Sequence, residues 1–128
     1  MDRKNIAVIG SGSWGIAISN ILAENGHIVN VWSFSEDEKN EINNEHKTRF
    51  IPDIILHDNV TASNDIKEVV EDSEIIFHVT PSKFTRDVFK QYKDYVGDKP
   101  IVICSKGFER ETLSTLDKVF LDEKPDVR

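Results

Sequence analysis

The feature that most constrains the fold is a glycine-rich hexapeptide, GSGSWG at residues 10–15, which follows an apolar run at residues 6–9. Glycines spaced G-x-G-x-x-G between a strand and a helix allow a tight turn, close approach of a ligand to the backbone, and close helix packing. The free N–H groups and the positive dipole end of the helix then face an anion. The hexapeptide therefore predicts a cradle for the pyrophosphate of a dinucleotide.

The flanking residues supply the strand and the helix that such a motif needs. Apolar residues recur at helical spacing and predict one face that packs on a sheet. They are Trp14, Ala17, Ile18, Ile21 and Leu22. Asn25-Gly26 is typical of a helix end, and a second apolar strand begins at Ile28, which completes a βαβ unit of about thirty residues. The alternative is an ordinary strand–turn–helix whose glycines bind nothing.

Strand-like and helix-like segments alternate along the rest of the chain. Further strands are expected at residues 28–32, 60–62, 75–79 and 100–104, and further helices near 36–44, 65–71, 83–93 and 112–121. This alternation predicts an α/β fold, a Rossmann-type doubly wound parallel sheet in three layers. Ligands of such sheets bind beyond the carboxyl ends of the strands. The segments expected to rim one crevice are residues 10–15, 33–35, 80–84 and 105–107.

Charge and composition exclude several classes of partner. The 128 residues include 16 basic and 23 acidic side chains, for a net charge of −7. Binders of nucleic acid or of anionic membranes usually carry a basic excess, so we expect neither partner. No apolar run approaches the length that crosses a bilayer, and no histidine or cysteine spacing is typical of a metal site. The single cysteine, Cys104, fits a reducing cytoplasm.

Three residues at strand ends are candidates for cofactor contacts. Phe34 stands where NAD-binding sheets usually carry Asp or Glu, and its ring could stack on adenine; the absence of a cation there favours NAD over NADP. Lys106 is either a contact to a phosphate or carbonyl oxygen or a solvated loop lysine. Phe84 packs either beside a nicotinamide or in the core, and its position favours the core.

Other polar residues have structural interpretations. His78 lies in a strand predicted to be buried, which indicates a core histidine that makes one hydrogen bond. Ser35 and Glu38 have the spacing of a helix capping box. The acidic run at residues 36–38 is interpreted as a solvated helix end.

Several short motifs, in order along the chain, resemble the NAD(P)-dependent glycerol-3-phosphate dehydrogenase family. They are GSGSWG at 10–15, NGH at 25–27, VWSF at 31–34, FIP at 50–52, VTPS at 79–82 and SKGF at 105–108. The resemblance extends from about residue 5 to residue 121. It implies the N-terminal cofactor-binding domain of an oxidoreductase of phospholipid-precursor synthesis. Such enzymes interconvert dihydroxyacetone phosphate and sn-glycerol 3-phosphate by hydride transfer with a nicotinamide cofactor.

The resemblance also implies roles for individual residues. The cofactor-binding set is Gly10, Gly12, Ser13, Trp14, Gly15, Phe34, Phe84 and Lys106. Ser13 and Trp14 correspond to contacts near the pyrophosphate, and Lys106 to a lysine that touches both cofactor and substrate. Many bacterial members carry Arg or His where this chain has Phe34, which favours NAD as the cofactor.

Family members continue into a helical domain that holds the proton-transfer lysine and much of the substrate phosphate site. We therefore expect residues 1–128 to form a dinucleotide-binding domain that is incomplete at its C-terminus, with no catalytic residue before Arg128 and no turnover alone. Two alternatives remain open at this point: a stand-alone nucleotide-sensing module, and the cofactor domain of a β-hydroxyacid-type dehydrogenase. Association of identical chains through the strand at 101–104 is also left open.

Overall fold

A five-stranded sheet forms the centre of the molecule in the computed structural model, which describes residues 4–33, 35–47, 55–80, 82–104 and 116–125. The strands are β1 (Asn5–Ile9), β2 (Ile28–Trp32), β3 (Val60–Ser63), β4 (Ile75–His78) and β5 (Ile101–Ile103). All adjacent pairs are parallel, in the order β3-β2-β1-β4-β5. The predicted Rossmann-type parallel sheet is confirmed.

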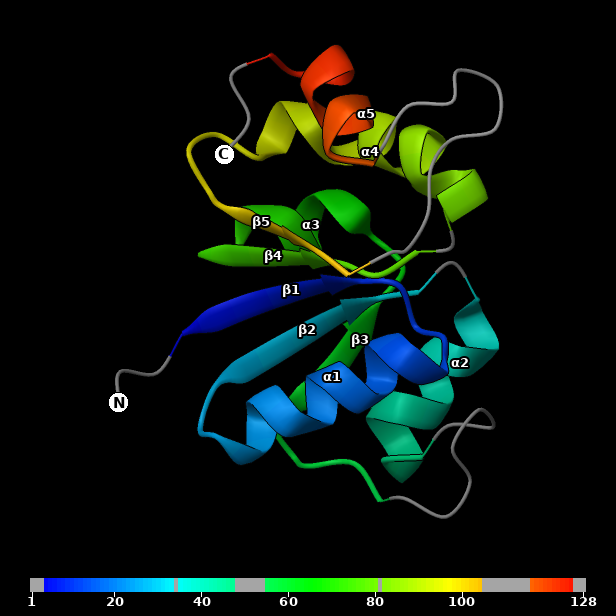
Figure 1. The fold of residues 1–128 in the computed structure, drawn as a ribbon. Helices are drawn as coiled ribbons and strands as arrows, with labels where there is room; N and C mark the ends of the chain where they lie inside the picture. The colour runs from blue at the N-terminus through cyan, green and yellow to red at the C-terminus, as the bar shows by residue number, and fades with distance from the viewer. Residues whose placement is uncertain (1–3, 34, 48–54, 81, 105–115, 126–128) are drawn as a thin grey trace.

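Helices cover both faces of the sheet and give the three layers that the sequence predicts (Figure 1). One face carries α1 (Ser13–Glu24) and α2 (Glu36–Asn40), which continues into the π-helical turn η1 (Glu41–Glu45). The other carries α3 (Ile66–Glu71), α4 (Thr85–Tyr92) and α5 (Leu116–Glu123). The 3-10 turns η2 (Ser82–Phe84) and η3 (Lys93–Tyr95) flank α4. Among the described residues, no helix has both the length and the apolar character needed to cross a membrane.

Strand β1 is buried on both faces and separates two cores. Ile6 and Val8 pack with α1 and η1, whereas Ala7 and Ile9 pack with α3, α4 and α5. A strand covered on both sides gains from apolar residues at every position, which explains why β1 lacks the alternation of a half-exposed strand.

The predicted packing face of α1 is correct only in part: Trp14 and Ile21 are 59% and 58% exposed, whereas Leu22 packs against the core. The buried residues of α1 are Gly15, Ile16, Ser19 and Ala23. The buried stripe begins at Gly15 and continues through small residues at helical spacing, which let α1 approach the sheet closely. Ser19 is tolerated there because its hydroxyl donates to the Gly15 carbonyl at 2.7 Å.

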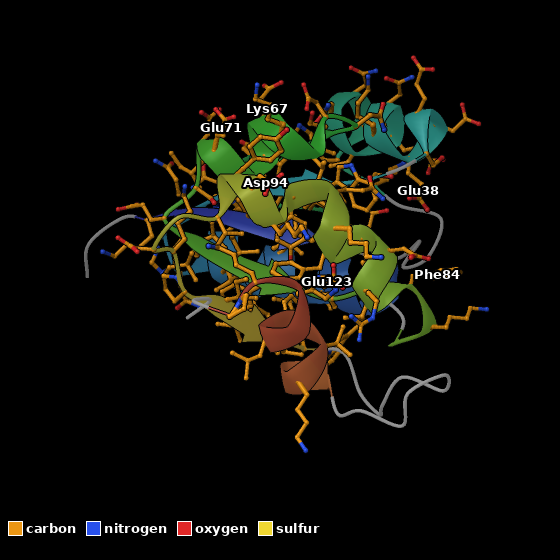
Figure 2. The ribbon with its side chains drawn as sticks, turned by 90° about the horizontal axis from the view of Figure 1, so that it is seen from above. Glu38, Lys67, Glu71, Phe84, Asp94 and Glu123 are labelled. Carbon is orange, nitrogen blue, oxygen red and sulfur yellow. The ribbon has the colours of Figure 1, made fainter. Side chains whose placement is uncertain are left out.

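Helix α5 is attached to α4 by charge and by aromatic packing. Glu123 accepts a hydrogen bond from Arg86 Nη1 at 2.7 Å and lies 3.4 Å from Lys93 Nζ. The Phe120 ring lies 4.3 Å from the Phe89 ring between their centroids. Figure 2 shows Glu123 at the α4–α5 boundary. These contacts fix α5 over the β4–β5 side of the sheet.

His78 is a fully buried core histidine, as predicted, but it makes two hydrogen bonds rather than one. Its Nδ1 lies 2.7 Å from the Tyr92 hydroxyl and its Nε2 lies 2.8 Å from the Thr80 hydroxyl. Burial lowers the pKa of this imidazole from 6.5 to about 3. The ring is therefore neutral at pH 7, with one donor and one acceptor for its two hydroxyl partners.

The pKa of His78 predicts that stability falls in mild acid. The unfolded chain binds a proton on this imidazole below pH 6.5, whereas the folded chain does not until about pH 3. The free energy of unfolding therefore decreases as the pH falls through that window. We expect His78 to account for a loss of about 2 kcal/mol between pH 7 and pH 5.

Urea unfolding followed by circular dichroism at both pH values, in the wild type and in His78→Leu, measures this contribution. The variant leaves the hydroxyls of Thr80 and Tyr92 without the imidazole, so it should be less stable at both pH values. Its loss of stability on acidification should nevertheless be smaller. An equal pH dependence in the two proteins would contradict the assignment.

Candidate functional site

The carboxyl ends of three strands meet at one edge of the sheet. Ile9, the last residue of β1, is in register with Trp32 of β2 and with His78 of β4. The backbone N–H of Gly10 donates to the Trp32 carbonyl at 3.2 Å, and that of Val79 donates to the Ile9 carbonyl at 2.9 Å. The glycine turn thus lies between β2 and β4, where the strand order reverses and where sheets of this kind bind ligands.

The fourth predicted segment of the rim, residues 105–107, lies outside the described residues, as do Phe34 and Lys106. The chain nevertheless leaves β5 beside the end of β4, since the N–H of Cys104 donates to the His78 carbonyl at 2.9 Å. The described part of the predicted crevice therefore consists of residues 10–15, 33, 35, 80 and 82–84.

The three glycines of the turn differ in their surroundings. Gly10 has a φ of +130°, and a Cβ there would lie 3.0 Å from the Val79 carbonyl oxygen. A Cβ on Gly15 would lie 2.3 Å from the carbonyl oxygen of Gly10, so the third glycine allows α1 to pack on the turn itself. A Cβ on Gly12 would have no described atom within 4 Å. Gly10 and Gly15 thus shape the turn, and Gly12 leaves its outer side open.

Helix α1 begins at this open side. Gly12 is the N-cap residue, it makes no side-chain cap, and the first turn of α1 contains no acidic residue. The first hydrogen bond of the helix runs from the N–H of Ile16 to the Gly12 carbonyl at 3.0 Å. The N–H groups ahead of it and the positive end of the helix dipole suit a phosphate, the group that the motif predicts.

Glu38 corrects the interpretation of residues 36–38 as a solvated helix end, because it is only 9% exposed. The Ser35 hydroxyl accepts from the Glu38 N–H at 3.3 Å, which is one half of the predicted capping box. The Glu38 carboxylate does not reach back to complete that box. Its Oε2 instead accepts hydrogen bonds from Ser33 Oγ, at 2.9 Å, and from Ser11 Oγ of the glycine turn. The sequence contained one signal for this contact with Glu38, namely a serine shortly after each strand: Ser11 after β1 and Ser33 after β2.

Two aromatic side chains near the turn are exposed. Trp14, in the first turn of α1, is 59% exposed, and Phe84, in η2, is 47% exposed. The expectation from position that Phe84 enters the core is therefore wrong, because Val88, Phe89 and Tyr92 of α4 fill that space. Figure 2 shows Phe84 and Glu38 toward the same end of the molecule. Ser13 is the first residue of α1.

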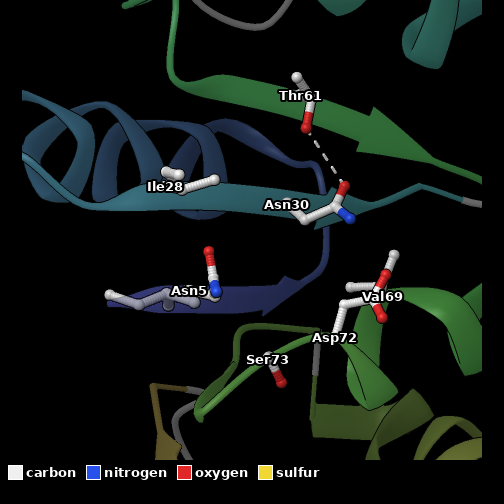
Figure 3. Close-up of a pocket in the computed structure, with 8 residues that line it drawn as sticks. Asn5, Ile28, Asn30, Thr61, Val69, Asp72 and Ser73 are labelled. Carbon is white, nitrogen blue, oxygen red and sulfur yellow. Dashed lines mark hydrogen bonds between the residues drawn. The ribbon is translucent and has the colours of Figure 1, made fainter. Parts of the chain in front are cut away.

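A hollow of about 240 Å³ lies at the opposite end of the sheet (Figure 3). It is lined by the first residues of β1 and β2, including Asn5 and Ile28, and by Asp72 and Ser73, which follow α3. In its wall the Thr61 hydroxyl donates to the Asn30 side-chain oxygen at 3.4 Å. These residues lie at the amino ends of the strands, away from the glycine turn, so the hollow is separate from the candidate site.

The strand order, the glycine turn at its reversal point and the uncapped helix above it define a dinucleotide-binding α/β domain. The model of one family, described as NAD-dependent glycerol-3-phosphate dehydrogenase N-terminus, matches residues 5–127. The chain belongs to this family.

Individual relatives agree with this assignment. The chain is 39% identical over 127 residues to glycerol-3-phosphate dehydrogenase [NAD(P)+] from Streptococcus sanguinis, covering 98% of this chain and 37% of that protein. The crystal structure of glycerol-3-phosphate dehydrogenase from Coxiella burnetii is similar with a TM-score of 0.90 at 29% identity, over 98% of this chain and 39% of that one. The enzyme from Saccharomyces cerevisiae gives a TM-score of 0.84 at 30% identity, over 95% and 39%. The chain thus spans less than two fifths of the length of these relatives.

The surroundings of the glycines predict that the same substitution destabilises the fold by different amounts at Gly15 and at Gly12. Gly15→Ala places a methyl group against a backbone oxygen at 2.3 Å, so we expect it to lower the free energy of unfolding by about 2 kcal/mol or more. Gly12→Ala meets open space, and we expect a loss of about 1 kcal/mol or less, from the poorer N-cap. Urea unfolding of both variants measures the difference. Equal destabilisation would contradict the assigned roles.

Proposed function

We propose that this chain is the NAD(H)-binding domain of an enzyme that interconverts dihydroxyacetone phosphate and sn-glycerol 3-phosphate. The observation that carries the proposal is the open side of the glycine turn at Gly12, below the uncapped start of α1. Membership of the glycerol-3-phosphate dehydrogenase family supports the substrate. When bound, the nicotinamide ring supplies or accepts the hydride.

The proposed cofactor contacts follow from the position of each residue. The backbone of Gly10, Gly12, Ser13 and Gly15 binds the pyrophosphate, since these residues form the turn and the start of the helix. The exposed rings of Trp14 and Phe84 provide apolar surface for the cofactor. By the family resemblance, Phe34 lies beside the adenosine, and Lys106 contacts both cofactor and substrate.

Local groups rather than overall charge must attract the cofactor. The chain carries a net charge of −7, which repels a dinucleotide at long range. The N–H groups at the start of α1 act at short range, where their partial positive charge attracts the pyrophosphate. The described residues directly after β2, Ser33 and residues 35–38, offer no cation for a 2′-phosphate, which supports NAD over NADP; the first basic residue there is Lys39, in the last turn of α2.

We further propose that the groups for proton transfer and for much of the substrate phosphate site belong to a helical domain outside residues 1–128. This proposal is supported by the match to the Streptococcus sanguinis relative, because the chain covers only 37% of the length of that protein. The proposed location is the cytoplasm, supported by the free thiol of Cys104. Association of identical chains also remains a proposal, supported by the place of β5 at the end of the described strand order.

The activity is tested on the complete gene product that carries this sequence. We expect oxidation of NADH on addition of dihydroxyacetone phosphate, with slower or weaker use of NADPH. The 128-residue chain alone should show no turnover and at most weak binding of NADH by calorimetry, because a crevice with one wall buries less of the ligand. Binding of NADH by the complete product without any turnover would favour a nucleotide sensor instead.

Gly12→Ala tests the proposed pyrophosphate site, with Asp37→Asn as its control. Its methyl group projects into the space assigned to the pyrophosphate while the fold is retained, so we expect NADH binding to weaken by about tenfold or more. Asp37→Asn changes an exposed residue of α2 and should leave NADH affinity within about twofold. Unchanged affinity in a folded Gly12→Ala protein would move the pyrophosphate site elsewhere.

A further inference from the structure

We propose that Glu38 determines nucleotide specificity: its enclosed carboxylate positions Ser11 and Ser33 and disfavours a dinucleotide that carries a 2′-phosphate. This inference rests on the proposed function of the chain as an NAD(H)-binding domain. It assigns to a residue in α2 the discrimination that the sequence alone had assigned to Phe34.

The carboxylate joins two segments of the candidate site. Ser33 is the first residue after β2, and its hydroxyl donates to Glu38 Oε2 at 2.9 Å. Ser11 is the second residue of the glycine turn, and its hydroxyl donates to the same oxygen. The two serine oxygens lie only 3.0 Å apart. Glu38 therefore holds the end of β2 and the glycine turn together at one point.

This point lies in the half of the crevice that receives the adenosine. In sheets with this strand order the pyrophosphate binds at the turn after β1, and an acidic side chain after β2 binds the adenosine ribose. The sequence shows no carboxylate directly after Trp32, the last residue of β2. The fold supplies one at the same place, because Ser35 starts α2 and the first turn of that helix returns Glu38 to Ser33.

The Glu38 carboxylate lies in an enclosed place without a countercharge among the described residues. The side chain is 9% exposed, so little water screens it. Its hydrogen bonds come from two neutral hydroxyls, and among the described residues no ion pair neutralises it. A ribose with free hydroxyls can approach such a carboxylate as a hydrogen-bond donor. A 2′-phosphate brings a second negative charge and offers no donor to offset the repulsion.

A purely structural role for Glu38 makes a different prediction. If the carboxylate served only to anchor α2, its removal would weaken the binding of both dinucleotides equally and lower stability. The ratio of the two dissociation constants separates these cases. A change in folding, or in the shape of the turn, affects the binding of groups that NADH and NADPH share, so it changes both dissociation constants and leaves their ratio unchanged.

The experiment measures the dissociation constants of NADH and NADPH by calorimetry in the complete gene product, in the wild type, Glu38→Gln and Glu38→Asp. We expect Glu38→Gln to shift the ratio toward NADPH by about fivefold or more, as loss of one charge repulsion implies. Glu38→Asp retains the charge and should retain most of the preference for NADH. A ratio within about twofold of the wild type in folded Glu38→Gln would overturn the proposal.

Two controls complete the test. Asp37→Asn removes one negative charge from the same turn of α2 at an exposed position and should leave the ratio unchanged; a shift as large as that of Glu38→Gln would also overturn the proposal. Should Glu38→Gln fail to fold, Glu38→Ala gives the same comparison, since the serines can hydrogen bond to each other across 3.0 Å. A wild type that binds neither dinucleotide would refute the proposed function. A wild type that binds NADH, with a ratio insensitive to residue 38, would refute only this inference.

Discussion

The contact between α1 and the carbonyl oxygen of Gly10 controls the arrangement of the rest of this structure. With a hypothetical Cβ on Gly15 only 2.3 Å from that oxygen, the helix can pack on the turn only if this position lacks a side chain. The contact fixes the rotation of α1 about its axis. It turns Ile16 and Ala23 toward the sheet, leaves Trp14 exposed, and directs the start of the helix to the open side of the turn at Gly12.

The sequence predicted the strands well, because their burial on both faces requires continuous apolar runs. The runs at β1 and β4 are correctly placed to within one residue, and the order of the elements was enough to infer parallel pairing. Helical periodicity was less informative for α1. Apolar spacing predicted a face that includes Trp14 and Ile21, whereas steric closeness at Gly15 selected a stripe of smaller residues. Periodicity records where apolar residues are, but not how closely a helix must approach its neighbour.

Glu38 shows a second limit of sequence reasoning. Charged residues in the first turn of a helix are usually solvated, and the spacing from Ser35 marked Glu38 only as a member of a local capping box. Only the fold brings Ser11, which is 27 residues away in the sequence, within hydrogen-bonding distance of its carboxylate. Local capping by Ser35 was predicted correctly, whereas the partner of the carboxylate depends on the meeting of two strand ends.

The position of Trp14 has a spectroscopic consequence. The chain contains two tryptophans, and their environments differ. Trp32 is 7% exposed, and its indole N–H donates to the Asn64 carbonyl at 3.1 Å, so its emission reports the integrity of the core. Trp14 is 59% exposed within the glycine-rich hexapeptide, so its emission is that of a solvated indole. The molecule thus contains two intrinsic fluorophores, one that follows unfolding of the core and one that reports on the surface at the glycine turn.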